Sequence, residues 1–213
     1  PRRIMKKFNL IKIFSIFIIF FLSTKPLLSA ESTDPIKVKW SFKGITGKFE
    51  RDSLQRGFQV YKEVCSSCHS MQYLSYRNLG EQGGPEFTAE EVKAIAASFE
   101  VEDGPDSQGE MFIRPGRPSD KFVSPYPNVN ASKAANGGAY PPDMSLLVKA
   151  RPGGSNYIYS VLVGYEEKPE GFILDDGVYY NKYMNGNKIK MSQPLSEGIV
   201  EYTDGTEATV EQM

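Results

Sequence analysis

The chain has 213 residues, in which 25 Lys and Arg stand against 26 Asp and Glu. Six of the basic residues and none of the acidic ones lie in residues 1–30, which leaves 19 basic and 26 acidic residues, a net charge of −7, in residues 31–213. Because binding to nucleic acid needs a basic surface, this composition excludes nucleic acid as a partner and favours a basic protein. Two cysteines exclude a disulfide framework, and the length suits one domain.

Residues 1–30 have the layout of a secretory signal peptide. Four of the first seven residues are basic, an apolar run follows that is cleanest from Ile13 to Leu22, and the small-residue site Leu28-Ser29-Ala30 precedes a polar Glu31. A membrane span needs about 20 apolar residues, roughly twice the length of this run. We therefore predict an export signal over 1–30 and a single domain over 31–213, with an uncleaved N-terminal anchor as the alternative.

The first predicted helix of this domain leads to the two cysteines. Ser53 is a candidate N-cap, and apolar positions recur after it at spacings of four, three and four residues: Leu54, Phe58, Tyr61 and Cys65. That spacing is typical of one face of a helix. The pattern predicts a helix that carries Cys65 on its buried face and places Cys68 one turn further along the same face.

An acidic stretch comes next. Nine carboxylates and one lysine lie between Glu81 and Glu110, and among them Thr88 and Glu91 have the spacing of a capping box. The box predicts a short helix that ends near Phe99. The charge run itself is explained either by a solvated surface insertion or by a docking surface for a partner, and the sequence leaves both open.

Loops dominate the remainder of the domain. Residues 104–142 are rich in Pro, Gly, Asn and Asp, which predicts a long ordered loop with one helical turn near 131–135. Proline near a first turn favours a helix over Met144–Arg151, and a further helix is predicted over Tyr157–Val163, closed by Gly164. The tail is predicted as loop with scattered short strands. No segment of the domain is long and apolar enough to span a bilayer.

Both cysteines and the only histidine lie within five residues, Cys65-Ser66-Ser67-Cys68-His69. This C-x-x-C-H pattern fits three chemistries. A thioredoxin-like dithiol uses the cysteines alone and belongs in a βαβ context, which the sequence does not predict. A zinc site needs four ligands, so a carboxylate or water must complete it here. Covalent haem attachment uses all three residues, with a thioether from each cysteine and the imidazole on the iron.

Haem attachment explains the pattern best. Side chains three positions apart on a helix project from the same face, so both thiols reach one edge of a porphyrin. Export supports this interpretation, because c-type haem is attached outside the cytoplasm. We predict one covalent haem c on Cys65 and Cys68, with His69 as an iron ligand; zinc and a redox dithiol are the alternatives.

The sixth ligand of such an iron cannot be a second histidine of this chain, because His69 is the only one. A methionine thioether would raise the reduction potential. Met71 is too near His69 to reach the opposite haem face, and Met144 falls in a predicted helix where a core role is the default. The methionines in predicted loops are Met111, Met184 and Met191. Met191 lies far along the chain and Pro194 stiffens its loop, so position favours Met191.

Four stretches of the sequence resemble the cytochrome c1 family, which supplies the haem subunit of ubiquinol–cytochrome c reductase, the bc1 complex. They are RGFQVYKEVCSSCHSMQYLSYRNL, YPNVNASKAANGGAYPPDMSLLVKARPGGSNYIYSVLVGY, GVYYNKYMNGNKIKMSQPL and YTDGTEATVEQM. Together they cover most of residues 31–213, and the run from Asn136 to Tyr165 is far more specific than C-x-x-C-H. Lys133 departs from the family pattern, because many members have Arg there.

The resemblance implies roles for individual residues. It gives the haem thioethers to Cys65 and Cys68, the proximal bond to His69 and the distal bond to Met191. It also implies a second group around the haem, with Arg151 beside a propionate and Asn136, Pro142 and Tyr157 lining the pocket. From the residues alone, Arg151 also suits the C-terminal end of its predicted helix, and Pro142 suits a simple helix start.

The resemblance further implies a mainly α, class I cytochrome c-like haem domain with long loop insertions. Its expected function is to pass single electrons from the Rieske iron–sulfur protein to cytochrome c, in a complex with cytochrome b on the periplasmic side of a bacterial inner membrane. The C-terminal membrane anchor of the family is not expected in this chain, and no catalysis is expected from the chain alone. The alternatives are a free-standing exported mono-haem electron carrier and an exported thiol oxidoreductase.

Overall fold

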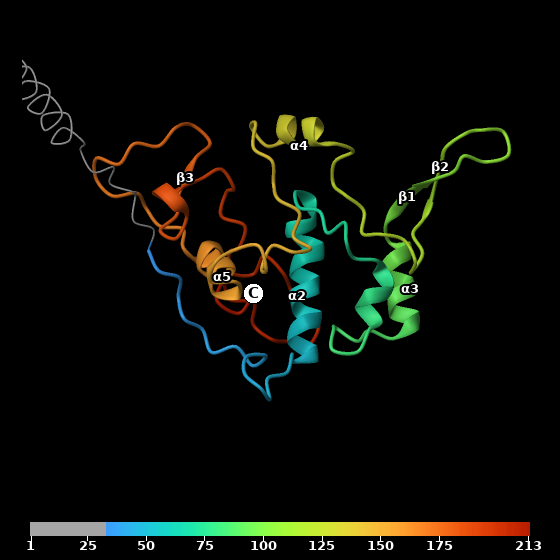
Figure 1. Cartoon of the computed structure of the whole chain (residues 1–213), viewed down its shortest axis with the longest axis horizontal. Helices are drawn as coiled ribbons and strands as arrows, with labels where there is room; N and C mark the ends of the chain where they lie inside the picture. The colour runs from blue at the N-terminus through green and yellow to red at the C-terminus, as the bar shows by residue number, and fades with distance from the viewer. Residues whose placement is uncertain (1–32) are drawn as a thin grey trace, which may run out of the picture. The chain divides into compact units, whose positions relative to one another are not determined.

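The computed structural model describes residues 33–213, so the predicted signal peptide lies outside the described residues. Figure 1 shows α-helices joined by long irregular segments, with more helix than strand. The α-helices of this part are α2 (Arg51–Glu63), α3 (Ala89–Ala97), α4 (Val129–Ala135) and α5 (Ser155–Val163). The strands are β1 (Glu100–Asp103), β2 (Phe112–Pro115), β3 (Tyr179–Tyr180) and β4 (Lys188–Ile189). The 3-10 helices are η1 (Cys65–Ser67), η2 (Tyr76–Gly80) and η3 (Asn185–Asn187).

Helix α2 is present as predicted, but its two ends differ from the prediction. Its N-cap is Glu50 rather than Ser53, which lies inside the first turn and accepts a hydrogen bond from Arg56. The α-helix stops at Glu63, before the cysteines. Two hydroxyls bind backbone carbonyls at this end: Ser66 donates to the carbonyl of Lys62 and Ser67 to that of Val64, each at 2.8 Å. These bonds satisfy carbonyls that a helix end leaves without partners.

The predicted capping box of α3 is confirmed. The backbone N–H of Glu91 donates to the Thr88 hydroxyl at 3.2 Å, and the N–H of Thr88 donates to the Glu91 carboxylate at 2.8 Å. Val92 and Ala96 on the opposite face are buried. The acidic stretch is therefore part of the folded domain, because one face of its helix packs in the hydrophobic core. Its carboxylates remain largely exposed.

The prediction of one long loop over 104–142 was wrong, because strand β2 lies within it. β2 pairs antiparallel with β1 and places Phe112 opposite Asp103. Phe112 and Ile113 are consecutive apolar residues, and both are exposed. The sequence of β2 therefore lacks the alternation of apolar and polar residues that indicates a strand. The predicted helical turn near 131–135 is confirmed and belongs to α4.

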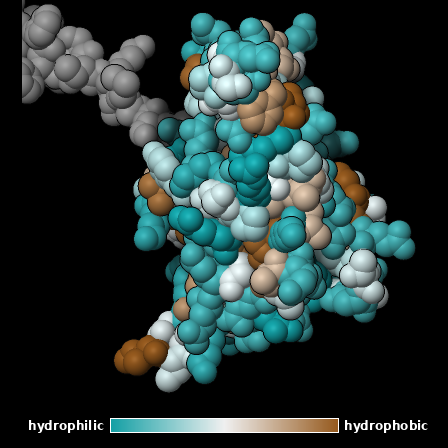
Figure 2. All heavy atoms as spheres, turned by 90° about the vertical axis from the view of Figure 1, so that its right-hand side faces the viewer, coloured by the Kyte–Doolittle hydropathy of each residue, from teal (hydrophilic) through white to brown (hydrophobic). Residues whose placement is uncertain are grey.

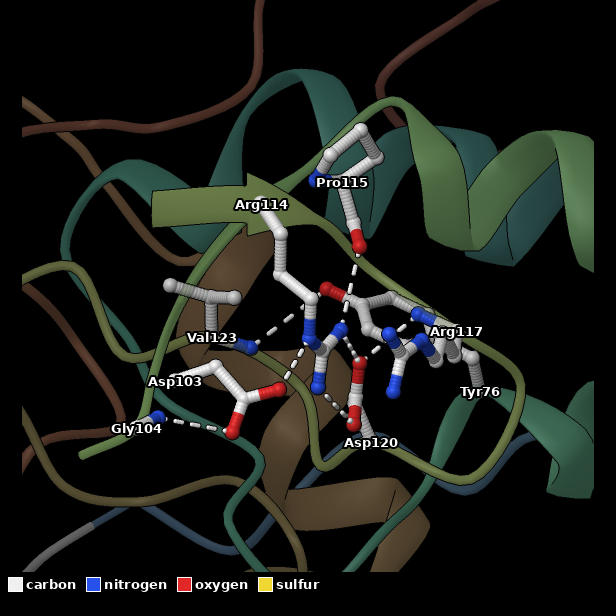
Figure 3. A network of polar contacts seen from close by, with 8 residues as sticks. All are labelled: Tyr76, Asp103, Gly104, Arg114, Pro115, Arg117, Asp120 and Val123. Atoms are coloured by element: carbon white, nitrogen blue, oxygen red, sulfur yellow. Dashed lines mark hydrogen bonds and ion pairs between the residues drawn. The ribbon is translucent and has the colours of Figure 1, made fainter. Parts of the chain in front are cut away.

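An arginine fixes the hairpin (Figure 3). The Arg114 guanidinium binds both carboxylate oxygens of Asp120, at 2.6 Å and 3.0 Å, and its Nε donates to Asp103. The Asp120 carboxylate also accepts from the backbone N–H of Arg117 at 2.7 Å. Two-point binding of a carboxylate by a guanidinium is directional as well as strong, so the network joins both strands to the turn that follows β2.

The predicted helix over Met144–Arg151 was also wrong, since the structure has a series of turns there. The N–H of Met144 donates to the carbonyl of Ser70 at 2.8 Å, a contact made across the molecule rather than within a helix. The predicted helix over 157–163 is confirmed as α5, and Gly164 caps its C-terminus. A side chain at Gly164 would collide with the ring of Tyr183, which explains the glycine.

Most of the buried hydrophobic residues form two clusters, and α2 contributes to both. The first cluster contains Tyr61, Tyr76, Leu79, Val92, Ala96 and Phe122. The second contains Val60, Leu195, Val200, Tyr202 and Ala208. Cys65, just beyond the end of α2, packs against both clusters. The C-x-x-C-H turn is therefore attached to both hydrophobic clusters.

The face of the molecule in Figure 2 is mostly hydrophilic. Figure 2 shows apolar residues as separate patches among polar ones on the face that it presents. The exposed apolar residues of β2 and the position before it are Met111, Phe112 and Ile113. Across residues 33–213, none of the helices combines the length and the apolar character that crossing a membrane requires.

Candidate functional site

The C-x-x-C-H segment is a tight turn that follows α2. The backbone N–H groups of Cys68 and His69 both donate to the carbonyl of Cys65, at 3.1 Å and 2.9 Å. This geometry differs from the predicted continuation of α2, because η1 is a 3-10 helix and winds more tightly. Both cysteines carry free, half-buried thiols. Burial raises the pKa of the Cys65 thiol, and nearby Cys68 adds to the shift, so the Cys65 thiol is held neutral.

The imidazole of His69 is held in one orientation. Its Nδ1 lies 2.8 Å from the carbonyl oxygen of Pro142. A carbonyl oxygen only accepts, so Nδ1 carries the proton and donates. In a neutral ring the lone pair is then on Nε2, which is the arrangement that a metal-binding histidine uses. The alternative role of Pro142 as a simple helix start is wrong, because no helix follows it.

Asp143 secures the segment that presents the Pro142 carbonyl, and sequence reasoning missed it. One oxygen of its carboxylate accepts from the Ser70 hydroxyl and from the backbone N–H of Gln72, both at 2.8 Å. The other oxygen accepts from the N–H of Ser145 at 2.9 Å. Partial burial raises the pKa of Asp143, but these hydrogen bonds outweigh it and leave the pKa below its usual value. The one feature of the sequence that could have indicated this role is that Asp143 directly follows Pro142, which was predicted to line the pocket.

Met191 lies on the loop that follows β4 and is half-buried. The hydroxyl of Tyr165, just beyond α5, donates to the backbone carbonyl of Met191 at 3.0 Å. The preceding Lys190 donates through its ammonium to the carbonyl of Gly137 at 2.8 Å. The segment from Asn136 to Asp143 is thus contacted near one end by the methionine loop and at the other by His69 and its neighbours.

The other predicted pocket residues have distinct surroundings. The Asn136 amide donates to the carbonyl of Ser132 at 2.7 Å, which closes the last turn of α4. The hydroxyl of Tyr157, on α5, is 3.4 Å from the sulfur of Met184. Arg151 is exposed, and its guanidinium donates to the carbonyl of Ala150 at 3.2 Å. Its alternative role at a helix C-terminus is wrong, because that helix does not form.

Two cavities in the described part of the chain differ in their relation to the predicted site. The larger, of about 380 Å³, is lined by residues 197–209 and touches none of the predicted site residues. The smaller, of about 280 Å³, adjoins Cys68 and is lined by Ser70, Tyr126, Tyr140 and Pro141 among others. The Tyr126 hydroxyl approaches the Cys68 sulfur to 4.0 Å. The turn therefore has open space beside one of its thiols.

These donors fit a covalently bound haem. Two free thiols stand in one short turn, next to an imidazole whose Nδ1 bond leaves its other nitrogen as the one that could bind a metal. A thioether on a separate loop, Met191, is half-buried and its backbone is held by Tyr165. Imidazole plus thioether is an axial pair found in c-type cytochromes.

Comparisons with known proteins identify the family of this chain. A model of the Cytochrome C1 family matches residues 40–213. The protein named Cytochrome b/c1 of Bradyrhizobium diazoefficiens is 50% identical over 200 residues, which cover 85% of this chain and 29% of that protein. Cytochrome c1-2, heme protein, mitochondrial, of Solanum tuberosum is 51% identical over 174 residues, 82% of this chain and 66% of that protein.

A third relative carries the name Cytochrome b-c1 complex catalytic subunit, mitochondrial, and comes from Candida albicans. It is 47% identical over 180 residues, which cover 84% of this chain and 62% of that protein. The chain thus spans between 29% and 66% of the length of these three relatives. With a family match over more than four fifths of its residues and relatives near 50% identity, the chain belongs to the Cytochrome C1 family.

Proposed function

We propose that this chain is the haem-carrying, electron-transferring part of a bc1 complex. Cys65 and Cys68 would bind one haem c through thioethers, and His69 and Met191 would be the axial ligands. The observation that carries the proposal is the bond from His69 Nδ1 to the Pro142 carbonyl, which leaves Nε2 for iron beside two free thiols. The names of two relatives, a heme protein and a b-c1 complex subunit, support the assignment.

The haem, when bound, supplies a one-electron couple between ferrous and ferric iron. The residues of this chain hold and tune it. The Pro142 carbonyl increases the basicity of the imidazole, and the thioether of Met191 favours the ferrous state. Exposed Arg151 would offset the charge of a propionate, with Asn136 and Tyr157 in the pocket wall. We assign the domain, residues 31–213, to the class I cytochrome c fold, preceded by an export signal over 1–30.

The proposed path runs from a Rieske iron–sulfur protein, through this haem, to a cytochrome c, in a membrane complex with cytochrome b. The haem domain would face the periplasm of a bacterium. Exposed carboxylates of the acidic stretch would favour a short encounter with a basic acceptor. No bond-making chemistry is assigned to the chain itself, so its part in the reductase activity is electron relay.

The test is a pyridine haemochrome spectrum of the chain matured in a host with a haem-attachment system, together with haem staining after denaturing electrophoresis. We expect one haem per chain, retained on the denaturing gel because the thioethers are covalent. The variants Cys65→Ala and Cys68→Ala should each weaken that retention. A colourless wild-type chain would contradict the proposal.

A free-standing mono-haem carrier is the second candidate, since an exposed acidic surface would serve it equally. Purification from membranes of the native host separates the two. Co-isolation with a cytochrome b and a Rieske protein is expected for the complex, whereas a carrier would purify alone.

A further inference from the structure

Two segments that are 73 residues apart in the sequence form a closed ring of hydrogen bonds around His69. On one side, His69 and Ser70 are neighbours in the chain, and on the other, Pro142 and Asp143 are neighbours. The His69 ring contacts the Pro142 carbonyl, and the Ser70 hydroxyl contacts the Asp143 carboxylate, each at 2.8 Å. Because each pair of neighbours is joined by a peptide bond, a displacement of either segment affects both contacts.

Further bonds extend this pairing on the same two segments. The N–H of Met144 donates to the carbonyl of Ser70 at 2.8 Å, and the N–H of Tyr73 donates to the hydroxyl of Ser145 at 3.1 Å. Ser70 is only 7% exposed, so its hydroxyl has little access to water. The Asp143 carboxylate occupies the centre of the pairing, because it accepts from donors on both segments.

These hydrogen-bond donors stabilise the negative charge of the Asp143 carboxylate. Among the ion pairs of residues 33–213, none includes Asp143. A carboxylate that only terminated a surface ion pair would not need three converging N–H and O–H groups. Bonds to a charged acceptor are stronger than neutral ones, so this residue contributes more to the pairing than any single backbone contact.

We propose that Asp143 is a positioning residue for the axial histidine: it fixes the two segments so that the Pro142 carbonyl stays on His69 Nδ1. The inference rests on the proposed function, since it concerns the ligand of the haem iron. Through that carbonyl, Asp143 controls two properties of the ligand, the rotation of the imidazole plane and its basicity.

The direction of the effect follows from the hydrogen bond. A carbonyl that accepts from Nδ1 makes the imidazole a stronger donor, which favours ferric iron and lowers the reduction potential. Removing Asp143 lets the 142–145 segment move away from Ser70 and lengthens the Nδ1 bond. We therefore expect the potential to rise and the orientation of the ring to vary from molecule to molecule.

The experiment uses the haem-loaded full chain in membranes, with Asp143→Ala and Asp143→Asn. Potentiometric titration of the haem and the low-temperature electron paramagnetic resonance spectrum of its ferric form are the readouts, because the largest g value responds to axial-ligand orientation. Asp143→Ala should raise the potential and shift or broaden that g value. Asp143→Asn keeps one carbonyl oxygen as an acceptor, so its shifts should be smaller and in the same direction.

Asp106 supplies a matched control. Its carboxylate also accepts two backbone N–H groups, from Gln108 at 2.8 Å and Glu110 at 3.0 Å, but it lies in the β1–β2 hairpin. Asp106→Ala should leave the potential and the g value unchanged. If Asp143→Ala does not mature, Ser70→Ala and Asp143→Asn still remove parts of the ring and should shift both readouts.

The outcomes separate this inference from the proposed function. Fully loaded Asp143 and Ser70 variants with wild-type potential and g value would overturn the role of Asp143 and leave the haem assignment intact. A wild-type chain without haem would overturn both. Equal shifts in the Asp106 and Asp143 variants would also overturn the inference, because they would show a general effect of losing a loop carboxylate.

Discussion

The phenolic hydroxyl of Tyr165 donates a hydrogen bond of 3.0 Å to the backbone carbonyl of Met191. Burial raises the pKa of Tyr165 well above its usual value, so the hydroxyl remains a donor at any physiological pH. Tyr165 also pairs with Asn181 in an isolated β-bridge, and Asn181 is fully buried. The loop of the proposed distal ligand is therefore tied to the segment that follows α5.

This contact predicts that Tyr165→Phe weakens the hold on Met191 without removing the ligand. Loss of one hydrogen bond to a partly buried carbonyl costs about 1 to 2 kcal/mol. The near-infrared charge-transfer band of thioether-ligated ferric haem should persist in buffer and disappear at lower urea concentration than in the wild type. The control is Tyr179→Phe, because the Tyr179 side chain is exposed. Equal urea midpoints for all three proteins would contradict the prediction.

Replacing the proposed distal ligand has a larger expected effect. Met191→Leu keeps the side-chain volume but removes the sulfur, so the near-infrared band should vanish and the reduction potential should fall markedly. Met184→Leu is the matched control, because Met184 is a neighbouring loop methionine whose sulfur contacts Tyr157 instead. Loss of the band in Met184→Leu, with the band retained in Met191→Leu, would reassign the ligand.

The Arg114–Asp120 pair predicts a pH dependence of stability. Hydrogen bonds from Arg114 lower the pKa of Asp120 to about 2, whereas the pKa of an aspartate in the unfolded chain is about 3.9. Because the folded pKa is the lower one, the stabilisation is complete above about pH 4 and is lost as the pH falls towards about 2. Urea midpoints across this range should fall more steeply for the wild type than for Asp120→Asn.

An aspartate without such a partner controls for general acid effects. Asp175 is exposed, and Asp175→Asn should retain the steep wild-type pH dependence. If Asp120→Asn and the wild type lose stability in parallel between about pH 4 and about pH 2, the pair contributes nothing to acid sensitivity.

The acidic stretch predicts a salt-dependent encounter with a basic acceptor. Glu100 and Glu102 suit the test, because both are exposed, whereas Asp103 is bound to Arg114 and its replacement would disturb the hairpin. Glu100→Gln combined with Glu102→Gln should slow reduction of a basic cytochrome c at low salt on the order of twofold, and the difference should vanish at high salt. Stopped-flow rates at several ionic strengths measure this.

A double variant elsewhere on the surface provides the comparison for that measurement. Glu167→Gln with Glu170→Gln removes the same charge from an exposed loop outside the acidic stretch. Equal slowing by the two double variants would indicate net charge rather than a docking surface, and no slowing by either would leave the acidic stretch as solvated surface.

The sequence alone determined the features whose signals are local. The capping box of Thr88 and Glu91 and the helix α5 were predicted because a few neighbouring residues specify them. The C-x-x-C-H pattern predicted the proposed haem-attachment residues for the same reason, since two cysteines and a histidine within five residues are recognised without knowledge of the fold. Met191 was favoured only by its position in the chain and by family resemblance.

Tertiary structure decided what depends on distant partners. The predicted helix over 144–151 gave way to turns because the N–H of Met144 binds Ser70, and the β1–β2 hairpin follows from Arg114 binding carboxylates on either side of it. The carbonyl that orients His69 and the carboxylate of Asp143 come from a segment 73 residues away. Side-chain periodicity records only which face of an element is buried, and it contains no information on which distant backbone group will accept a given hydrogen bond.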